Sequence, residues 1–230
     1  MRYIHVVGPH EQFWAGGRYV HYIPDGSETY IEQWAIHRLP DDAFLIRVDR
    51  DGRQYDGHSI LLEAWRSPDA EGGEIVRFDI HAFGQARDKV RQVRATYQVV
   101  DEMLHIGLSL NDAPREYTEM PLDNALLFPV LSPFLGEYLS ALSMKGQSDV
   151  LRPKLSFDAP LAFTIERYTD KASYLKQDTL TCCGRVFNAT AYSWQGDTAW
   201  VDETGTLLKI IDDDICRLEL MDYARTGYHD

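Results

Sequence analysis

The residues best suited to chemistry in this chain are two adjacent cysteines, eight histidines and a run of three aspartates. Cys182 and Cys183 could supply thiolates to a soft metal or act as nucleophiles, because the thiolate is the reactive form of cysteine. The surrounding sequence predicts a strand, and adjacent side chains on a strand point to opposite faces. We therefore expect that the two thiols cannot share one ion unless the backbone is distorted. Buried, inert thiols are the simpler interpretation, because cysteine is among the most buried residue types.

The histidines and aspartates form no recognisable metal motif. No H-E-x-x-H, H-x-H or C-x-x-C string occurs in the chain. The run 212–214 lacks the alternating ligands and bracing glycine of a calcium loop, so we predict a solvated hairpin tip there. The G-x-S-x-G elbow of serine hydrolases is also missing. The sequence therefore predicts neither metal nor cofactor, although a catalytic group assembled from distant residues would leave no local motif.

Charge and composition limit the classes of partner. The 230 residues carry 36 acidic and 23 basic side chains, and the net charge of −13 disfavours binding to phosphate backbones and anionic lipid headgroups. No stretch approaches the roughly 20 apolar residues that span a bilayer. The start, "MRYIHVVGPHEQFW", lacks the regions of a secretory signal, and three cysteines make no disulfide framework. We therefore expect a cytoplasmic protein that binds no nucleic acid and has no membrane span.

Strand-like alternation dominates the chain. In residues 74–82 apolar and polar side chains alternate, which is the period-two pattern of a sheet with one dry face. Residues 93–110 repeat the pattern on both sides of a turn and predict a hairpin. The segments 29–37 and 58–67 are apolar on both faces, as in central strands that are covered on both sides. These patterns predict a mainly β (α+β), antiparallel fold in a single domain, 1–230.

One helix interrupts the strands, over residues 133–144. Its apolar side chains recur at helical spacing: Phe134, Leu135, Tyr138, Leu139 and Leu142. Ser132 is predicted as the N-cap, Pro133 as the first helical residue and Gly146 as the stop. We expect the helix to cover the concave side of the sheet, with Leu139 among its most enclosed residues.

The order of these elements is similar to a known family. A long antiparallel sheet is followed by the crossing "DNALLFPVL", by the single helix and by "WVDETGTLLK", which is typical of a terminal meander. From about Thr29 onward this layout resembles the half-barrel superfamily of bacterial lipoprotein carriers and related uncharacterised proteins considered to be glycolipid binders. The resemblance implies a long curved antiparallel sheet, or open half-barrel, wrapped around one principal helix, with a hollow for an acyl chain. It carries over no specific residue, and the missing secretory signal distinguishes this chain from the periplasmic carriers.

Together these features predict a binding protein for an apolar or amphipathic, lipid-like small molecule, held between sheet and helix. Pockets for such molecules are mostly apolar, with few polar anchors. The predicted lining comes from the inner strand faces and the helix: Trp34, Phe44, Ile46, Phe78, Ile80, Tyr97, Phe134, Tyr138 and Leu142.

Three alternatives stay open at this point. The same apolar residues can simply fill a packed core. A metal-independent, barrel-type enzyme, such as an isomerase, cyclase or hydrolase of an apolar substrate, can use the same hollow. Exposed apolar surface can instead pair copies of the chain into a homo-oligomer. A buried cluster of carboxylate, histidine or tyrosine groups with perturbed pKa values in the cavity would favour the enzyme.

Overall fold

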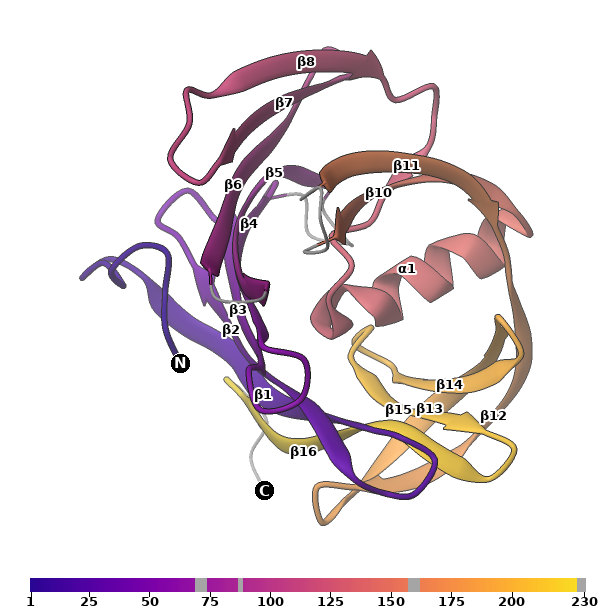
Figure 1. Ribbon diagram of the computed structural model, residues 1–230. Helices are drawn as coiled ribbons and strands as arrows, with labels where there is room; N and C mark the ends of the chain where they lie inside the picture. Colours follow the sequence, from indigo (N-terminus) through magenta and orange to yellow (C-terminus); the bar gives the residue numbers. More distant parts are fainter. Residues whose placement is uncertain (69–73, 87–88, 157–161, 227–230) are drawn as a thin grey trace.

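Alternating apolar residues form one long curved sheet, as the sequence predicts. The computed structural model of the protein describes residues 1–68, 74–86, 89–156 and 162–226. Its main sheet has 13 strands in the order β12-β13-β14-β15-β16-β1-β2-β3-β4-β5-β6-β7-β8, and each neighbouring pair is antiparallel. The sheet curves around the helix and stays open at its two edges, β8 and β12 (Figure 1).

Most neighbours in this sheet are also neighbours in the sequence. The first group of strands comprises β1 (Gln12–Tyr22), β2 (Glu28–Arg38), β3 (Phe44–Gly52), β4 (His58–Arg66), β5 (Ile75–Ala86), β6 (Lys89–Val100), β7 (Met103–Leu110) and β8 (Glu116–Pro121). The second comprises β12 (Ala172–Cys182), β13 (Arg185–Trp194), β14 (Asp197–Asp202), β15 (Leu207–Asp212) and β16 (Ile215–Arg225). The pairing of β16 with β1 joins the two groups into one sheet.

A small second sheet lies over the helix and was not predicted. It comprises β9 (Leu126–Leu127), β10 (Ser148–Ser156) and β11 (Ala162–Asp170), in the order β11-β10-β9. The pairing of β9 with β10 is parallel and involves only two residues of each strand, so it is an exception to the antiparallel rule. Figure 1 shows β10 and β11 on one side of the helix and β12–β15 on the other.

The helix α1 (Ser132–Lys145) begins and ends close to the predicted bounds, but its cap differs. The N-cap is Leu131, whose side chain makes no capping hydrogen bond. The prediction of Ser132 as N-cap is wrong because Ser132 is already helical. Its N–H donates to the carboxylate of Glu32 on β2, at 2.9 Å. Gly146 ends the helix with a φ of +74°, a conformation that glycine adopts without steric cost.

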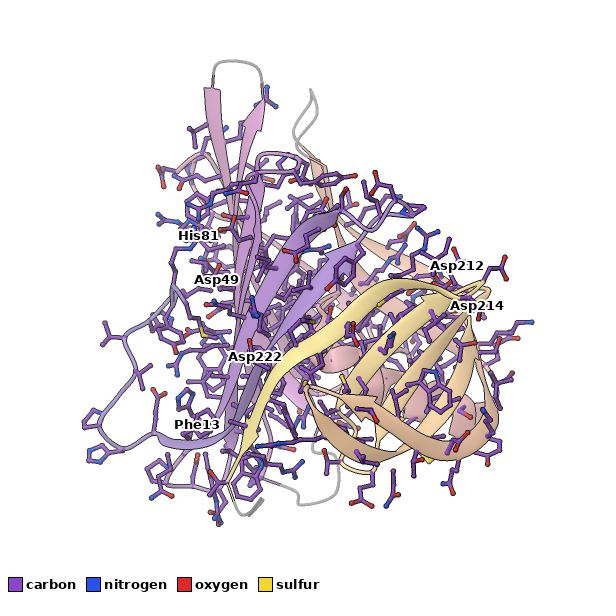
Figure 2. The ribbon with its side chains drawn as sticks, turned by 90° about the horizontal axis from the view of Figure 1, so that it is seen from below. Phe13, Asp49, His81, Asp212, Asp214 and Asp222 are labelled. Atoms are coloured by element: carbon purple, nitrogen blue, oxygen red, sulfur yellow. The ribbon has the colours of Figure 1, made fainter. Side chains whose placement is uncertain are left out.

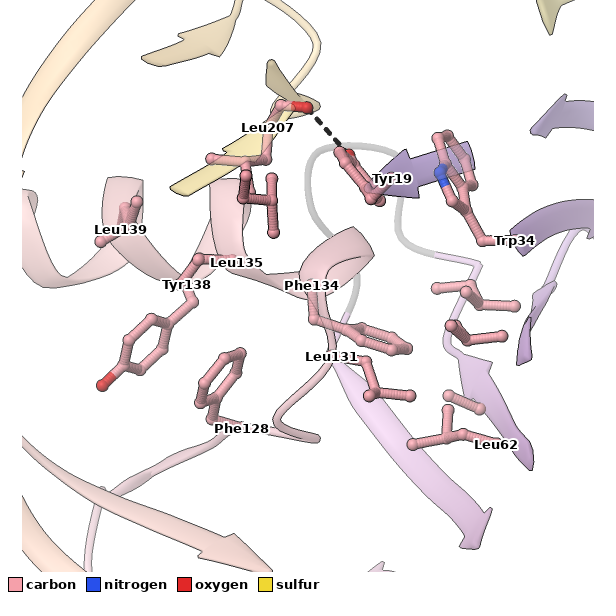
Figure 3. Packing of buried hydrophobic residues seen from close by; sticks show 14 of the residues in the cluster. Tyr19, Trp34, Leu62, Phe128, Leu131, Phe134, Leu135, Tyr138, Leu139 and Leu207 are labelled. Carbon is pink, nitrogen blue, oxygen red and sulfur yellow. Dashed lines mark hydrogen bonds between the residues drawn. The ribbon is translucent and has the colours of Figure 1, made fainter. Parts of the chain in front are cut away.

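The apolar stripe of α1 is buried in the core, as predicted. Leu139 and Leu142 are completely buried, and Phe134, Leu135 and Tyr138 nearly so. Figure 3 shows Leu131 and Phe134 on the side of Leu62, while Tyr138 lies against Phe128.

One position of the helix requires a glycine, because a Cβ on Gly136 would lie 2.2 Å from the carbonyl oxygen of Gly205. The turn between β14 and β15 therefore packs directly on the helix backbone.

The strands predicted to be apolar on both faces are central, but their outer cover is charged. Residues 1–11 lie over the outer face of β2–β4, where Arg2 pairs with Asp49 and Glu11 pairs with Arg47. Arg47 is buried and also pairs with the buried Glu63 on β4. Figure 2 shows Asp49 on this outer side. Within the described ranges, no helix is long and apolar enough to cross a membrane.

Candidate functional site

A cavity of about 380 Å³ lies beside the helix and is the best candidate for a site. It lies between α1, the crossing 122–129, the start of β5 and the end of β6. Its walls are slightly more apolar than polar, and the apolar residues include Ile75, Val99, Leu127, Phe128, Phe134 and Ala141. The crossing contributes much of this wall, and within it only Leu126 and Leu127 form a strand, the short β9.

Tyr138 provides a rigid wall of this cavity. Its ring stacks on Phe128 with the centroids 4.3 Å apart. Its hydroxyl donates to Asp170 at 2.8 Å, and the indole N–H of Trp194 donates to the same carboxylate at 2.8 Å. Burial raises the pKa of Tyr138 far above its ordinary value, and the hydrogen bonds to Tyr168 and Asp170 raise it further. The hydroxyl therefore stays protonated and is a structural anchor, not a base.

The rim of the cavity is charged and more acidic than basic. Glu74, Glu102, Glu137 and Lys145 border it. Two nitrogens of Arg66 bind the two carboxylate oxygens of Glu137, so that acid is already neutralised by its partner. The remaining lining charges are two carboxylates and one ammonium group, which leaves the rim with a small negative excess.

A second, smaller cavity of about 90 Å³ lies at the first turn of the helix. It is bordered by Trp34, Phe44, Pro133, Glu137 and the turn 204–206. Its volume has room for about three water molecules. The indole N–H of Trp34 is buried and has no hydrogen-bond partner.

The nine side chains predicted to line a hollow are divided among three places. Trp34 and Phe44 border the small cavity. Phe134 and Tyr138 border the large one. The remainder lie in or against the packed core and border neither cavity: Ile46, Phe78, Ile80, Tyr97 and Leu142.

The sequence prediction missed most of the large cavity's lining. The crossing 122–129 and Ala141 were not among the predicted residues. The signal that could have identified the crossing is its apolar run between two prolines, directly before the only predicted helix.

One buried carboxylate lies on the inner face of the sheet, but it does not border the large cavity. Glu32 is completely buried, with one oxygen 3.2 Å from Nε2 of His21 and the other accepting from the N–H of Ser132. Burial opposes ionisation, but the hydrogen bond and charge of His21, the charge of Arg50 and the Ser132 contact outweigh it. Together they lower the pKa of Glu32 to about 2. Glu32 therefore serves as an anionic cap for the helix N-terminus.

The two adjacent cysteines do not have the geometry that a strand would impose. Cys182 ends β12 and is buried, as predicted. Cys183 lies in the following turn with a φ of +52°, so its side chain does not alternate with that of Cys182. The two sulfur atoms are 3.8 Å apart. The assumption of a strand at both cysteines is thus wrong, because a tight turn replaces the strand at Cys183. The expectation that the thiols cannot share one ion applied only to an undistorted strand.

Comparison with known proteins adds no family. No protein-family model matches the chain, and a search of curated proteins also finds no match. The resemblance to the half-barrel carriers therefore stays a prediction. Among the residues that the structure describes, no three histidine, cysteine, aspartate or glutamate side chains gather closely enough to hold a metal ion.

Proposed function

We propose that the protein binds a small amphipathic molecule in the cavity beside α1. The apolar part of the ligand lies between the crossing 122–129 and the helix, and its polar head lies at the charged rim. The observation that carries this proposal is the combination of apolar walls and charged rim around about 380 Å³. That volume is within the range of about 300–1,000 Å³ that is typical of small-molecule sites.

The buried polar residues Tyr138 and Glu32 favour a binding function over a catalytic one, because neither can act as a base on a ligand in this cavity. Tyr138 keeps its proton, because its hydroxyl is buried and hydrogen-bonded. Glu32, the buried carboxylate with a strongly lowered pKa, caps the helix and does not border the cavity. A general base has to reach the proton that it removes. Neither residue meets that requirement for a ligand in this cavity.

The rim favours a ligand head that is uncharged or cationic. Its carboxylates Glu74 and Glu102 outnumber the ammonium of Lys145, and Glu137 is bound to Arg66. The whole chain adds a field of the same sign, because its net charge is −13. An anionic head would be disfavoured by roughly 1 kcal/mol, or about fivefold in affinity, for one uncompensated charge near water. Salt should reduce this preference.

The layout of the fold supports the same proposal. An open curved sheet around one helix agrees with the half-barrel layout that the sequence resembles, in which a hollow takes an acyl chain. We infer a cytoplasmic relative of such binders that works as a carrier or sensor of its ligand.

The proposal is tested by titrating the protein with the uncharged solvatochromic dye Nile red and displacing the dye with dodecylamine or dodecanoate. Ala141→Phe places a ring in the cavity and should weaken binding of the dye and of dodecylamine about tenfold or more, or roughly 1.4 kcal/mol. Met144→Phe is the matched control, because Met144 lies on the same helix and is exposed. Dodecylamine should displace the dye at a lower concentration than dodecanoate.

Two results would contradict the proposal. Equal binding by Ala141→Phe and by the unmodified protein would place the dye outside this cavity. No uptake of dye or amphiphile by folded protein would leave the apolar walls as part of a packed core.

A further inference from the structure

The turn between β12 and β13 brings two thiols together. Cys183 and Gly184 occupy it, with φ values of +52° and +71°. This left-handed pair is the backbone of a two-residue hairpin turn. Cys182 precedes the turn and pairs with Arg185 across the hairpin. The turn thus holds both sulfur atoms on one side, 3.8 Å apart, before any ligand is bound.

Both thiols face the same backbone oxygen on another strand. The carbonyl of Leu220 on β16 lies 3.0 Å from Sγ of Cys182 and 2.8 Å from Sγ of Cys183. The register of β16 against β1 shifts here, pairing Arg18 with Asp222 and Tyr19 with Leu220. A thiol is a weak hydrogen-bond donor, so these contacts orient the sulfur atoms without strongly protecting them. Cys182 is buried, whereas Cys183 is partly exposed and gives access from solvent.

The distance between the two sulfur atoms suits the formation of two bonds to one shared atom. Two thiolates on one tetrahedral centre, with bonds of roughly 2.3 Å, lie about 3.8 Å apart. A pyramidal centre has a narrower angle between its two bonds to sulfur, so the sulfur atoms must lie a few tenths of an ångström closer together. Small side-chain rotations can bring them to that distance. Thiolates are soft ligands and select soft centres. Because the described residues hold no third metal-binding side chain beside this pair, a centre that needs only two protein ligands fits best.

We propose that Cys182 and Cys183 form a dithiol site for one soft, thiophilic centre of the trivalent arsenical class. The site is independent of the amphiphile-binding cavity, because neither cysteine borders that cavity. In the reaction with phenylarsine oxide, two S–H bonds and the arsenic–oxygen bond break, and two arsenic–sulfur bonds form. The oxygen leaves with both thiol protons as water. Arsenic stays trivalent, so no oxidant or reductant is needed.

The ionisation of the pair agrees with this chemistry. A hydrogen bond from Cys183 lowers the pKa of Cys182, and the same contact raises the pKa of Cys183. The first sulfur–arsenic bond forms at one of the two sulfur atoms, and the second thiol closes the ring as its proton passes to the leaving oxygen.

The test uses folded full-length protein, phenylarsine oxide and intact mass spectrometry. One arsenical should bind per chain, resist an excess of a monothiol such as mercaptoethanol, and be removed by the dithiol dimercaptopropanol. Cys182→Ser and Cys183→Ser should each weaken monothiol-resistant binding by about 100-fold or more, because the second contact then loses its intramolecular advantage. Cys216→Ser is the matched control, because Cys216 lies on β16 and should not take part.

Three outcomes would overturn the proposal. Folded protein with no adduct, but an adduct in urea, would make the pair an inert, buried structural feature. Loss of the adduct in Cys216→Ser would place the site elsewhere. An adduct that either single serine variant retains in excess monothiol would show that only one thiol binds. Circular dichroism of each variant separates these results from loss of folding.

Discussion

Two completely buried tyrosines differ in what their hydroxyl groups contact. Tyr19 donates to the carbonyl of Leu207 at 2.9 Å, as the dashed line in Figure 3 shows. Tyr97 stacks on Phe78 with centroids 4.4 Å apart, and its hydroxyl has no hydrogen-bond partner. Burial raises the pKa of both hydroxyls, so both are neutral in the folded protein. The two residues therefore form a matched pair for measuring the cost of an unsatisfied polar group.

Removing each hydroxyl should change stability in opposite directions. Tyr97→Phe should leave the free energy of unfolding unchanged or raise it by about 1 kcal/mol, because it deletes a buried group without a partner. Tyr19→Phe should lower it by about 1–2 kcal/mol, because it leaves the Leu207 carbonyl without this donor. Urea unfolding of both variants checks the prediction. A loss at Tyr97 as large as at Tyr19 would mean that a bound molecule satisfies the Tyr97 hydroxyl.

Sequence patterns predicted that Phe78 and Tyr97 are buried, but they did not predict what the buried hydroxyl groups contact. The alternation that places Phe78 and Tyr97 inside is a local property of each strand, so it can be read from the chain. The partner of Tyr19 comes from β15, which is 188 residues away, and no local pattern encodes it. The ion pairs of Arg47 with Glu11 and Glu63 also join separate segments of the chain, so no local pattern predicted them.

The helix depends on the sheet for its N-terminal cap. Its bounds could be predicted because Pro133 and Gly146 are local start and stop signals. Its cap could not, because the carboxylate comes from Glu32, 100 residues before Ser132 in the chain. A helix N-terminus attracts negative charge, and Glu32 provides that charge inside the protein. The contact ties α1 to β2 at a fixed position.

This contact should make stability depend on acid in a specific way. The pKa of Glu32 is about 2 in the folded protein, against an ordinary value of 4.5. A lowered folded pKa contributes stability above the unfolded pKa, and that stability is lost as the pH falls from 4.5 toward 2. Glu32→Gln should therefore lower the free energy of unfolding by about 3 kcal/mol at neutral pH, and the difference should shrink across that range.

Urea unfolding of the unmodified protein and the variant, measured from pH 7 to pH 2.5, checks this prediction. Glu28→Gln is the control, because Glu28 is exposed at the start of the same strand. Its effect should stay within about 0.5 kcal/mol. A constant difference between Glu32→Gln and the unmodified protein over the whole range would show that the carboxylate charge does not stabilise the helix.

At the scale of the whole molecule, local hairpins were predictable and distant junctions were not. Alternation and turns predicted antiparallel strands and the hairpin over residues 93–110, which is the pair β6–β7, and the order from β1 to β8 follows the chain. The pairing of β16 with β1 and the parallel contact of β9 with β10 join segments far apart in sequence. The cavity lies where such segments meet, because α1, the crossing 122–129 and the β5–β6 end converge there. A hollow between sheet and helix was expected, but only Phe134 and Tyr138 of its predicted lining border this cavity.

The hairpin tip shows how far a local pattern can be trusted. The run of aspartates was predicted as a solvated turn, and Asp213 and Asp214 occupy the turn between β15 and β16 with positive φ values. Asp212 and Asp214 lie together at the far end of the hairpin in Figure 2. The prediction is confirmed for Asp213 and Asp214, which are exposed, whereas Asp212 is the last residue of β15 and is half-buried.

The central claim is that an apolar chain occupies the cavity beside α1. Photo-labelling tests it most directly, with dodecylamine that carries a diazirine near the end of its chain. After irradiation and proteolysis, mass spectrometry should find the label on peptides covering residues 122–145. Unlabelled dodecylamine should compete with it, and Ala141→Phe should reduce it while Met144→Phe does not. Label on the exposed strand β12 or the edge strand β8, unaffected by Ala141→Phe, would contradict the account.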